Sequence, residues 1–174
     1  AYKGCFTSIW PIYNGETQTG VTLHYIDEGI DTGDILDQEP IEIDRSVTAR
    51  ILYEKYQDAA LSLLSRNIEN IYNSSWHFRH PQPASGSSYF SRKSLSKLSL
   101  EIDPWLTAEQ ISLHVRSLYF PEFQTATLGY QNIIACDILP ERSTATPGTI
   151  IFEDSAIIRM ATIDYDVLLH KSIN

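Results

Sequence analysis

Residues 20–38 read GVTLHYIDEGIDTGDILDQ, and this stretch organises the whole first half of the chain. Apolar Val21, Leu23 and Tyr25 alternate with their neighbours, and three of the six residues 21–26 are β-branched. Such an alternation predicts a β-strand. Two acids and a glycine then predict a loop over 27–29, and a second extended stretch follows over 35–43. The segment therefore predicts two strands joined by an acidic loop that contains glycine.

The acids of this loop and of the second strand form the densest charge cluster in the chain: Asp27, Glu28, Asp31, Asp34 and Asp37. A calcium-binding EF-hand loop requires a spacing of acids and glycine that this segment does not have. A hydrolase with paired carboxylates requires a distinct second carboxylate site, of which one loop gives little sign. A solvated acidic loop is the plainest alternative, and we expect no metal site.

The order of residues within the loop favours a ligand site over a solvated loop. Asp31 lies between Gly29 and Gly33, and two glycines let the backbone approach a ligand closely. Exposed backbone amides there can recognise a flat heterocycle, and one carboxylate can handle a proton. We therefore expect a small-molecule site around Asp31, and we expect His24 to be structural or exposed to solvent.

Helical patterns lie on both sides of this stretch. We expect a short helix over 6–14 that stops at Gly15. The strongest helical pattern runs over 46–71 with an apolar stripe of period 3.6 and Ser46 as its N-cap. A helix of this length needs a sheet or partner helices to bury that stripe.

The second half of the chain begins with a stretch that has no periodicity. Residues 72–100 are rich in Ser, Pro and basic residues and predict a linker. Thr107 and Gln110 form a capping box that starts a second helix, which Pro121 ends. Short β-like runs separated by turn residues follow from Thr125 to His170, so we expect a small antiparallel sheet or barrel.

Composition excludes several classes of protein. The 174 residues carry a net charge of −9, with nine acids and one base in residues 1–44. An acidic chain repels polyphosphate at long range, so we do not expect general nucleic-acid binding. Apolar runs fall far short of the roughly 20 residues that span a bilayer, so we expect no membrane association. Cys5 and Cys136 fit no metal or CxxC spacing, which predicts free thiols and a cytoplasmic protein.

Five short motifs at fixed offsets resemble the folate-dependent formyltransferases, which include the methionyl-tRNA, glycinamide ribonucleotide and sugar-amine enzymes. The motifs are Tyr2-Lys3-Gly4, Ile9-Trp10-Pro11-Ile12, Asn14-Gly15-Glu16, Thr19-Gly20-Val21-Thr22 and Gly29-Ile30-Asp31-Thr32-Gly33-Asp34. The resemblance covers the first 40 residues closely and continues more loosely to Ile71. Residues 88–93, 101–103, 116–121 and 147–149 also resemble the region that follows the catalytic domain in the tRNA and sugar-amine branches.

The resemblance implies transfer of a formyl group from 10-formyltetrahydrofolate, as co-substrate, to a primary amine. In the family an Asn, a His and an Asp do this work, and Asp31 matches the Asp. It would raise the pKa of the His and help to move the proton of the amine, while the Asn and His stabilise the oxyanion. The family's backbone contacts to the pterin ring correspond to Asp27, Glu28, Gly29, Ile30 and Asp31.

The sequence departs from the family at its start. The family's Asn and His lie in an N-x-H-x-S-L-L-P stretch that would precede Ala1, so we expect an N-terminal half upstream and an inactive isolated chain. The coding sequence upstream of Ala1 tests this. A chain without that stretch would be a non-catalytic or vestigial fragment that binds a ligand or a partner.

The acceptor amine is argued from charge. Residues 75–174 hold ten acids and eight bases, a poor surface for gripping tRNA. A nucleotide-linked amino sugar needs only a few donors and an aromatic surface, for which the candidate residues are Trp10, Tyr13, Tyr89, Arg92 and Lys93. We therefore favour a nucleotide-linked amino sugar, with methionyl-tRNA as the alternative.

The expected fold is α/β. Residues 1–75 would be the C-terminal half of a Rossmann-like formyltransferase domain, 76–100 a linker with a basic strip, and 101–174 a small subdomain of one helix and antiparallel β-strands. Apolar faces of the first part would stay uncovered without the other half. Exposed apolar surface favours association, so a homodimer is a further expectation.

Overall fold

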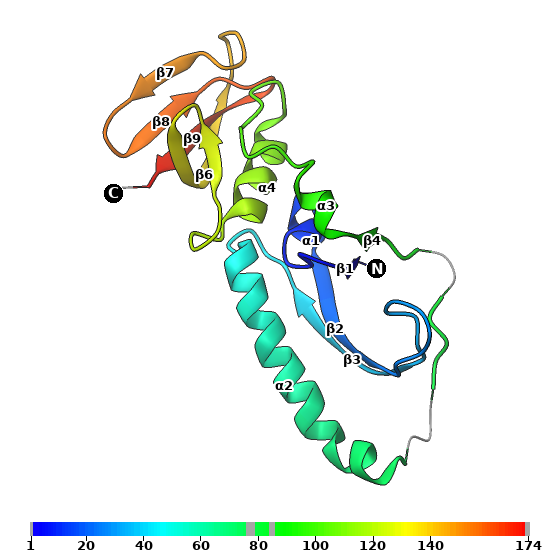
Figure 1. The fold of residues 1–174 in the computed structure, drawn as a ribbon. Helices are drawn as coiled ribbons and strands as arrows, with labels where there is room; N and C mark the ends of the chain where they lie inside the picture. The colour runs from blue at the N-terminus through cyan, green and yellow to red at the C-terminus, as the bar shows by residue number, and fades with distance from the viewer. Residues whose placement is uncertain (1, 76–78, 84–85, 173–174) are drawn as a thin grey trace.

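The computed structural model describes residues 2–75, 79–83 and 86–172 (Figure 1). The elements in chain order are β1 Lys3–Gly4, α1 Trp10–Tyr13, β2 Gln18–His24, β3 Ile35–Glu42, α2 Ala49–Asn73, β4 Tyr89–Phe90, α3 Arg92–Leu95, α4 Ala108–Leu118, β5 Ala126–Leu128, β6 Gln131–Arg142, β7 Ile150–Glu153, β8 Ile157–Met160 and β9 Tyr165–Lys171. The mixed α/β architecture is the expected one. Figure 1 shows two parts, with α2 and the β2–β3 hairpin at one end and the β5–β9 sheet at the other.

The two predicted strands form an antiparallel hairpin. β2 pairs with β3 from Gln18↔Glu42 to Leu23↔Asp37, and the register shifts at the Leu23/His24 step. Gly20 sits where a Cβ would lie 2.6 Å from the Glu39 carbonyl oxygen, so the strands can approach at this point only because the residue is glycine. The register shift occurs at the end of β2 that leads into the acidic loop.

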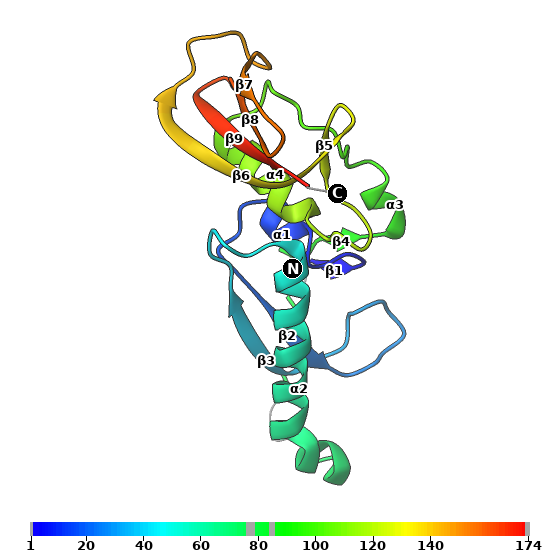
Figure 2. The same ribbon diagram turned by 90° about the vertical axis from the view of Figure 1, so that its left-hand side faces the viewer.

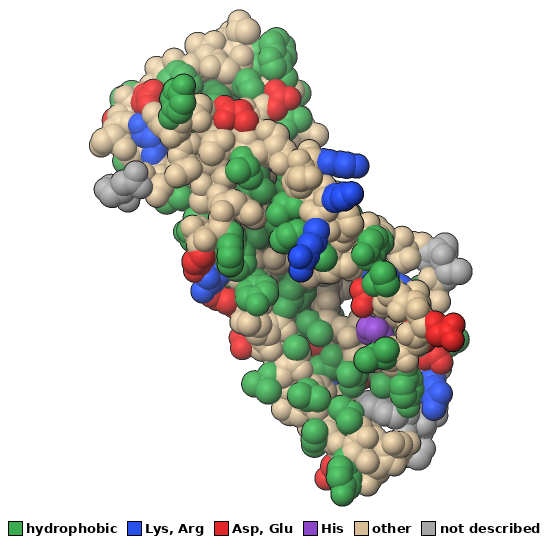
Figure 3. Space-filling view, in the orientation of Figure 1, with side chains coloured by type: hydrophobic (Ala, Val, Ile, Leu, Met, Phe, Trp, Pro, Cys, Tyr) green, Lys and Arg blue, Asp and Glu red, His purple; other side chains and the backbone are tan. Residues whose placement is uncertain are grey.

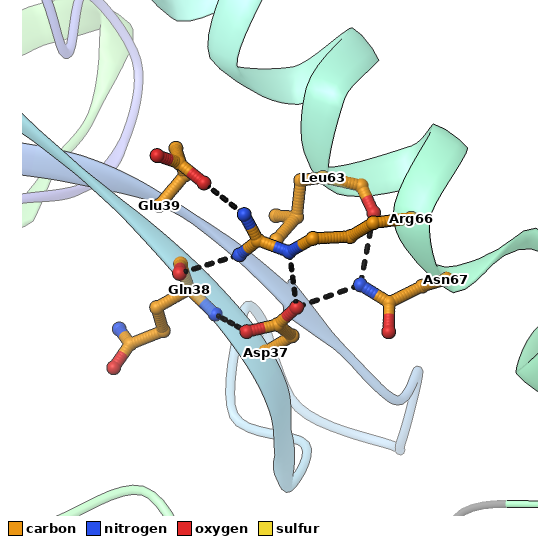
Figure 4. Close-up of polar contacts among 6 residues, drawn as sticks. All are labelled: Asp37, Gln38, Glu39, Leu63, Arg66 and Asn67. Atoms are coloured by element: carbon orange, nitrogen blue, oxygen red, sulfur yellow. Dashed lines mark hydrogen bonds and ion pairs between the residues drawn. The ribbon is translucent and has the colours of Figure 1, made fainter.

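Helix α2 runs along the hairpin and is joined to it by a polar network (Figure 4). The Asp37 carboxylate on β3 accepts hydrogen bonds from Arg66 Nε at 2.8 Å and from Asn67 Nδ2 at 2.7 Å. Arg66 also pairs with Glu39. The Arg66 guanidinium, through its hydrogen bond, lowers the pKa of Asp37 to about 2. These contacts fix the last turns of the helix on the hairpin.

The start of α2 corrects one sequence prediction. Thr48, not Ser46, is the N-cap, and its hydroxyl accepts from the backbone N–H of Ile51. Ser46 instead donates to the Asp44 carboxylate in the preceding turn. Both residues are good caps by type, so the sequence alone did not separate them.

The predicted short helix over 6–14 is also shorter than expected. Only Trp10–Tyr13 is helical, with Pro11 in its first turn, because the proline ring suits a helix start and not its interior. Gly15 follows with φ of 72°, which agrees with its predicted role in stopping the helix. Ile12 is fully buried and joins the core of Ile41, Ile43, Val47, Leu52 and Ala59.

The stretch predicted to lack secondary structure returns to the first part of the chain and forms two short elements there. β4 pairs in parallel with β1, at Lys3↔Tyr89 and Gly4↔Phe90. His80 pairs with Ile35 across an isolated bridge. The prediction of no element over 72–100 was therefore wrong at β4 and α3. The partner of β4 lies more than 80 residues away, and α3 is a single helical turn.

The C-terminal part matches its prediction closely. Helix α4 begins at the Thr107–Gln110 capping box, and the sheet has the order β5-β6-β9-β8-β7 with antiparallel pairing throughout. The core between helix and sheet contains Ile102, Ala108, Ile111, Val115, Leu118, Ala126, Ile133, Ile158, Met160, Val167 and Leu169. Both cysteines are free, as predicted, and burial raises the pKa of Cys136 to about 12.

The two parts contact each other beside α1 (Figure 2). Arg116 on α4 donates from one terminal nitrogen to the carbonyl oxygens of Asp44 and Val47, both at 3.0 Å. The ring of Tyr13 meets that of His114 edge-on, with centroids 6.2 Å apart. The loop before α2 is therefore anchored on the C-terminal part by a charged side chain.

A large share of the apolar stripe of α2 faces solvent. Figure 3 shows hydrophobic side chains along this end of the molecule. The large apolar residues of α2 that are exposed are Ile51, Tyr53, Leu61, Leu64, Ile68, Ile71 and Tyr72. None of the helices in the described part of the chain is both long and apolar enough to span a bilayer.

Candidate active site

Asp31 lies on the wall of a cavity of about 620 Å³. The cavity is open to solvent on one side and is bounded by β2, by the first residues of the chain, by α2 and by residues 82–83 and 86–87. Figure 3 shows a hollow in the surface between α2 and the part of the molecule opposite this helix, which contains the loop after β2. Its described lining includes Lys3, Gly4, Thr22, Gln38, Tyr56, Gln57 and Gln82. Among the polar side chains of the lining, neutral amides and hydroxyls thus outnumber charged groups.

The acidic loop has a defined internal structure. The Asp27 carboxylate accepts hydrogen bonds from the backbone N–H of Gly29 at 3.0 Å and from the Thr32 hydroxyl at 2.6 Å. The Thr32 hydrogen bond is the main cause that lowers the pKa of Asp27. Asp31 has φ of 54°, in the left-handed region, a conformation that an Asp tolerates better than most residues. Asp27 therefore shapes the loop while Asp31 faces the cavity.

The ends of the loop are held together by backbone contacts. The N–H of Tyr25 donates to the Asp34 carbonyl at 3.0 Å, and Gln82 Nε2 donates to the Gly33 carbonyl at 2.7 Å. A Cβ on Gly33 would lie 1.9 Å from the Tyr25 carbonyl oxygen, so only glycine fits. The Arg79 guanidinium covers the Tyr25 ring at 4.5 Å. The base of the loop is thus fixed, and the tip is exposed, with Ile26 95% and Ile30 66% accessible.

His24, expected to be structural or exposed to solvent, is partly exposed and lies beside the candidate acid. Its Nε2 lies 3.8 Å from Asp31 Oδ1, and its Nδ1 lies 2.7 Å from the Tyr25 carbonyl oxygen. The side chain lines the cavity together with Gly20 and Thr22. The sequence of β2 contains a signal for this face: positions 20, 22 and 24 lie on one side of the strand, and all three residues are small or polar.

Tyr56 is a second cavity residue that the sequence analysis missed. Its hydroxyl lies 2.9 Å from the Thr19 hydroxyl and donates to the Thr7 carbonyl at 3.2 Å. Burial raises the pKa of Tyr56, which keeps the phenol neutral. An aromatic residue inside an apolar helical stripe gives no sign of such a role, because it is equally typical of a core position.

The five residues expected to bind the acceptor do not gather around Asp31. Trp10 is buried, stacks on Phe90 with ring centroids 4.3 Å apart, and donates its Nε1–H to the Cys5 carbonyl at 3.3 Å. Tyr13 meets Trp10 edge-on. Tyr89, Arg92 and Lys93 are exposed on β4 and at the start of α3. None of the five is among the described residues that line the cavity.

No metal-binding cluster accompanies the site. Across residues 2–75, 79–83 and 86–172, no three His, Cys, Asp or Glu side chains come together in a way that could hold an ion. The Asp27 carboxylate instead accepts from one backbone N–H and one hydroxyl, and the Asp31 carboxylate lies near His24. The site offers acid–base and hydrogen-bonding groups.

Comparison with known proteins decides the family. Residues 1–68 match the family described as Formyl transferase. The chain is 30% identical over 98% of its length to methionyl-tRNA formyltransferase of Clostridioides difficile, of which it spans 55%. The chain belongs to the formyltransferase family. It is also 34% identical over 74% of its length to GDP-perosamine N-formyltransferase of Brucella melitensis, spanning 48% of that protein.

Solved structures agree with this assignment and with the Rossmann-like fold of formyltransferases. An N-formyltransferase from Helicobacter canadensis, in complex with folinic acid and dTDP-3-aminofucose, has a TM-score of 0.85 and 34% identity. A sugar 3-N-formyltransferase in the presence of dTDP and 5-N-formyl-THF has a TM-score of 0.85 and 36% identity. The chain covers 62% of each structure, and 98% and 99% of its own residues are aligned. It spans about half the length of the curated relatives that it matches.

Proposed function

We propose that this chain is the part of a formyltransferase that supplies Asp31 and the folate loop for transfer of a formyl group from 10-formyltetrahydrofolate to a primary amine. The amine is proposed to belong to a nucleotide-linked amino sugar. The observation that carries the proposal is the position of Asp31 in the cavity wall, on a loop whose base is fixed and whose tip residues are exposed.

The residues present fit a pterin ring and a formyl transfer. The exposed loop over 27–31 offers backbone N–H and C=O groups to the edge of a heterocycle, and the amides of Gln38, Gln57 and Gln82 line the same cavity. The bound folate would supply the activated formyl carbon. Asp31 is proposed to orient the amine and to hold the proton that the amine loses as its nitrogen bonds to that carbon. The Tyr56 phenol adds a neutral hydroxyl to the wall.

An amino sugar is favoured over methionyl-tRNA by charge and by the structural relatives. The two structures with a TM-score of 0.85 were determined with dTDP or a dTDP-linked amino sugar. Residues 75–174 carry ten acids and eight bases, whereas binding of tRNA depends on clustered positive charge. The relative from Clostridioides difficile supports the tRNA alternative, so both acceptors belong in the test.

The test is a formyl-transfer assay on the protein as its gene encodes it, with 10-formyltetrahydrofolate and three acceptors. The acceptors are a dTDP-linked amino sugar, a GDP-linked amino sugar and methionyl-tRNA. We expect transfer to a sugar nucleotide and about a 1,000-fold lower rate in Asp31→Asn, within the range of general acid–base catalysis. Asp58→Asn, an exposed acid on α2, is the matched control and should keep full activity.

Three outcomes would contradict the proposal in different ways. Transfer to methionyl-tRNA alone would overturn the acceptor, and full activity of Asp31→Asn would remove Asp31 from the mechanism. Folate binding without transfer to any amine would favour a binding protein. Residues 1–174 expressed alone should not transfer the formyl group, because the Asn and His of the family lie outside the residues that match this sequence. Activity of that piece would refute this part.

A further inference from the structure

The contacts of His24 determine which ring nitrogen carries a proton. Its Nδ1 lies 2.7 Å from the Tyr25 carbonyl oxygen, and a carbonyl oxygen only accepts hydrogen bonds. Nδ1 is therefore protonated and donates. In the neutral ring this leaves Nε2 as the acceptor, and Nε2 is the atom that faces Asp31 Oδ1 at 3.8 Å.

The surroundings hold His24 in this orientation. Its side chain is 25% exposed and that of Asp31 is 45% exposed. The residue that accepts from Nδ1, Tyr25, is itself fixed by its N–H bond to Asp34 and by Arg79 over its ring. The register of β2 against β3 shifts at the Leu23/His24 step, where β2 ends. Two loop carboxylates, Asp31 and Asp27, interact with the ring, Arg79 stacks on the neighbouring Tyr25, and Lys3 lines the same cavity.

We propose that His24 is the positioning residue of Asp31 and that its Nε2 exchanges one proton with the Asp31 carboxylate. The proposal rests on the proposed formyl transfer. As the amine nitrogen bonds to the formyl carbon, Asp31 takes its proton and passes it to Nε2. The proton returns through Asp31 to the folate nitrogen when the bond from that nitrogen to the formyl carbon breaks. The 3.8 Å separation closes by rotation of the carboxylate, as catalytic contacts tighten when substrate binds.

Two substitutions separate this role from a structural one. The Asn in His24→Asn reaches the Tyr25 carbonyl but not Asp31, whereas the Gln in His24→Gln extends toward Asp31 and donates but cannot take up a proton. With the complete protein and its preferred amine, we expect kcat to fall about 100-fold in His24→Asn. The KM values should stay within about 3-fold, and His24→Gln should recover about 10-fold of the loss. Unchanged kcat in His24→Asn, or full recovery of kcat in His24→Gln, would overturn the proposal.

A spectroscopic test does not depend on transfer activity. In the complete protein labelled with ¹⁵N, the ring nitrogens of His24 are observed through their couplings to the ring protons. We expect a protonated Nδ1, and a shift of the Nε2 resonance in Asp31→Asn. Glu28→Gln removes an exposed charge from the same loop and should leave Nε2 unchanged. A proton on Nε2 alone, or no response to Asp31→Asn, would refute the pairing even if formyl transfer is confirmed. Absence of transfer with the shift intact would refute only the proposed function.

Discussion

Helices α2 and α4 both carry an apolar stripe, but they use it differently. On α4, Ile111, Val115 and Leu118 are fully buried against the five-stranded sheet. On α2, Leu52 and Leu63 are buried, whereas Leu61 is 65% exposed and Ile68 is 54% exposed. The C-terminal part thus has a closed core, and the part with the candidate site buries only one side of its long helix. Periodicity therefore shows that a helix has an apolar face, but it does not show what covers that face.

The largest expected difference in the free energy of unfolding is between alanine substitutions of two isoleucines. Ile111→Ala removes a fully buried side chain from α4 and should lower the free energy of unfolding by about 2–5 kcal/mol, because a cavity remains. Ile68→Ala on α2 should change it by about 0.5 kcal/mol or less, as for an exposed site. Urea denaturation followed by circular dichroism measures both. An equal loss at Ile68 would show that the exposed face of α2 is covered in solution, by a second copy or by another surface.

The Asp37–Arg66 pair should contribute a smaller, pH-dependent stabilisation to the first part. Arg66 holds the pKa of Asp37 at about 2, below its usual 3.8. A depressed pKa stabilises the folded state above the unfolded pKa, so the contribution is complete above about pH 4 and disappears as pH falls toward 2. Asp37→Asn should cost about 1 kcal/mol at pH 7, since the pair is partly solvent-screened.

The measurement for this pair is urea denaturation between pH 2 and 7. The curves of wild type and Asp37→Asn should converge as pH falls toward 2. Asp58→Asn, exposed on α2, is the control and should follow wild type at every pH. A constant gap between wild type and Asp37→Asn would show that the ionised carboxylate is not what stabilises the hairpin on α2.

The smallest expected difference in stability is between substitutions of the two helix N-caps. On α4, the Thr107 hydroxyl accepts from the Gln110 N–H at 3.1 Å, and the Gln110 side chain accepts from the Thr107 N–H at 3.0 Å. On α2, Thr48 accepts from the Ile51 N–H at the longer distance of 3.3 Å. Thr107→Ala should cost about 1 kcal/mol and Thr48→Ala about half of that. Thermal unfolding of the two variants compares them, and a larger loss at Thr48 would reverse the ranking.

The elements with strong local signals were predictable. The β2–β3 hairpin, both long helices, the capping box and the C-terminal strands follow from periodicity and turn residues that lie within a few positions of one another. The acidic loop was also identified, because its two glycines and Asp31 are neighbours in sequence. The short elements β4 and α3 were missed, since a two-residue strand is defined by its distant partner and not by its own pattern.

The site residues divide in the same way. Asp31 was proposed from the loop alone, while His24 was expected to be structural or exposed because an isolated histidine on a strand is typical of such a position. Trp10 shows the reverse: its aromatic side chain suggested a binding surface, but the ring of Phe90, 80 residues along the chain, stacks on it. A side chain's neighbours across the fold decide whether it is available to a ligand.

The sequence by itself determined the longer helices and strands, the family resemblance and the candidate acid, because each depends on residues close together along the chain. Only the tertiary structure decided three things: which face of α2 is buried, which residues line the cavity, and that His24 faces Asp31. These depend on distances between segments, and the hydrophobic and hydrogen-bonding preferences of single residues do not specify those distances. His24 and Asp31 illustrate this, because only the folded arrangement of the strand end and the loop brings their side chains within 3.8 Å.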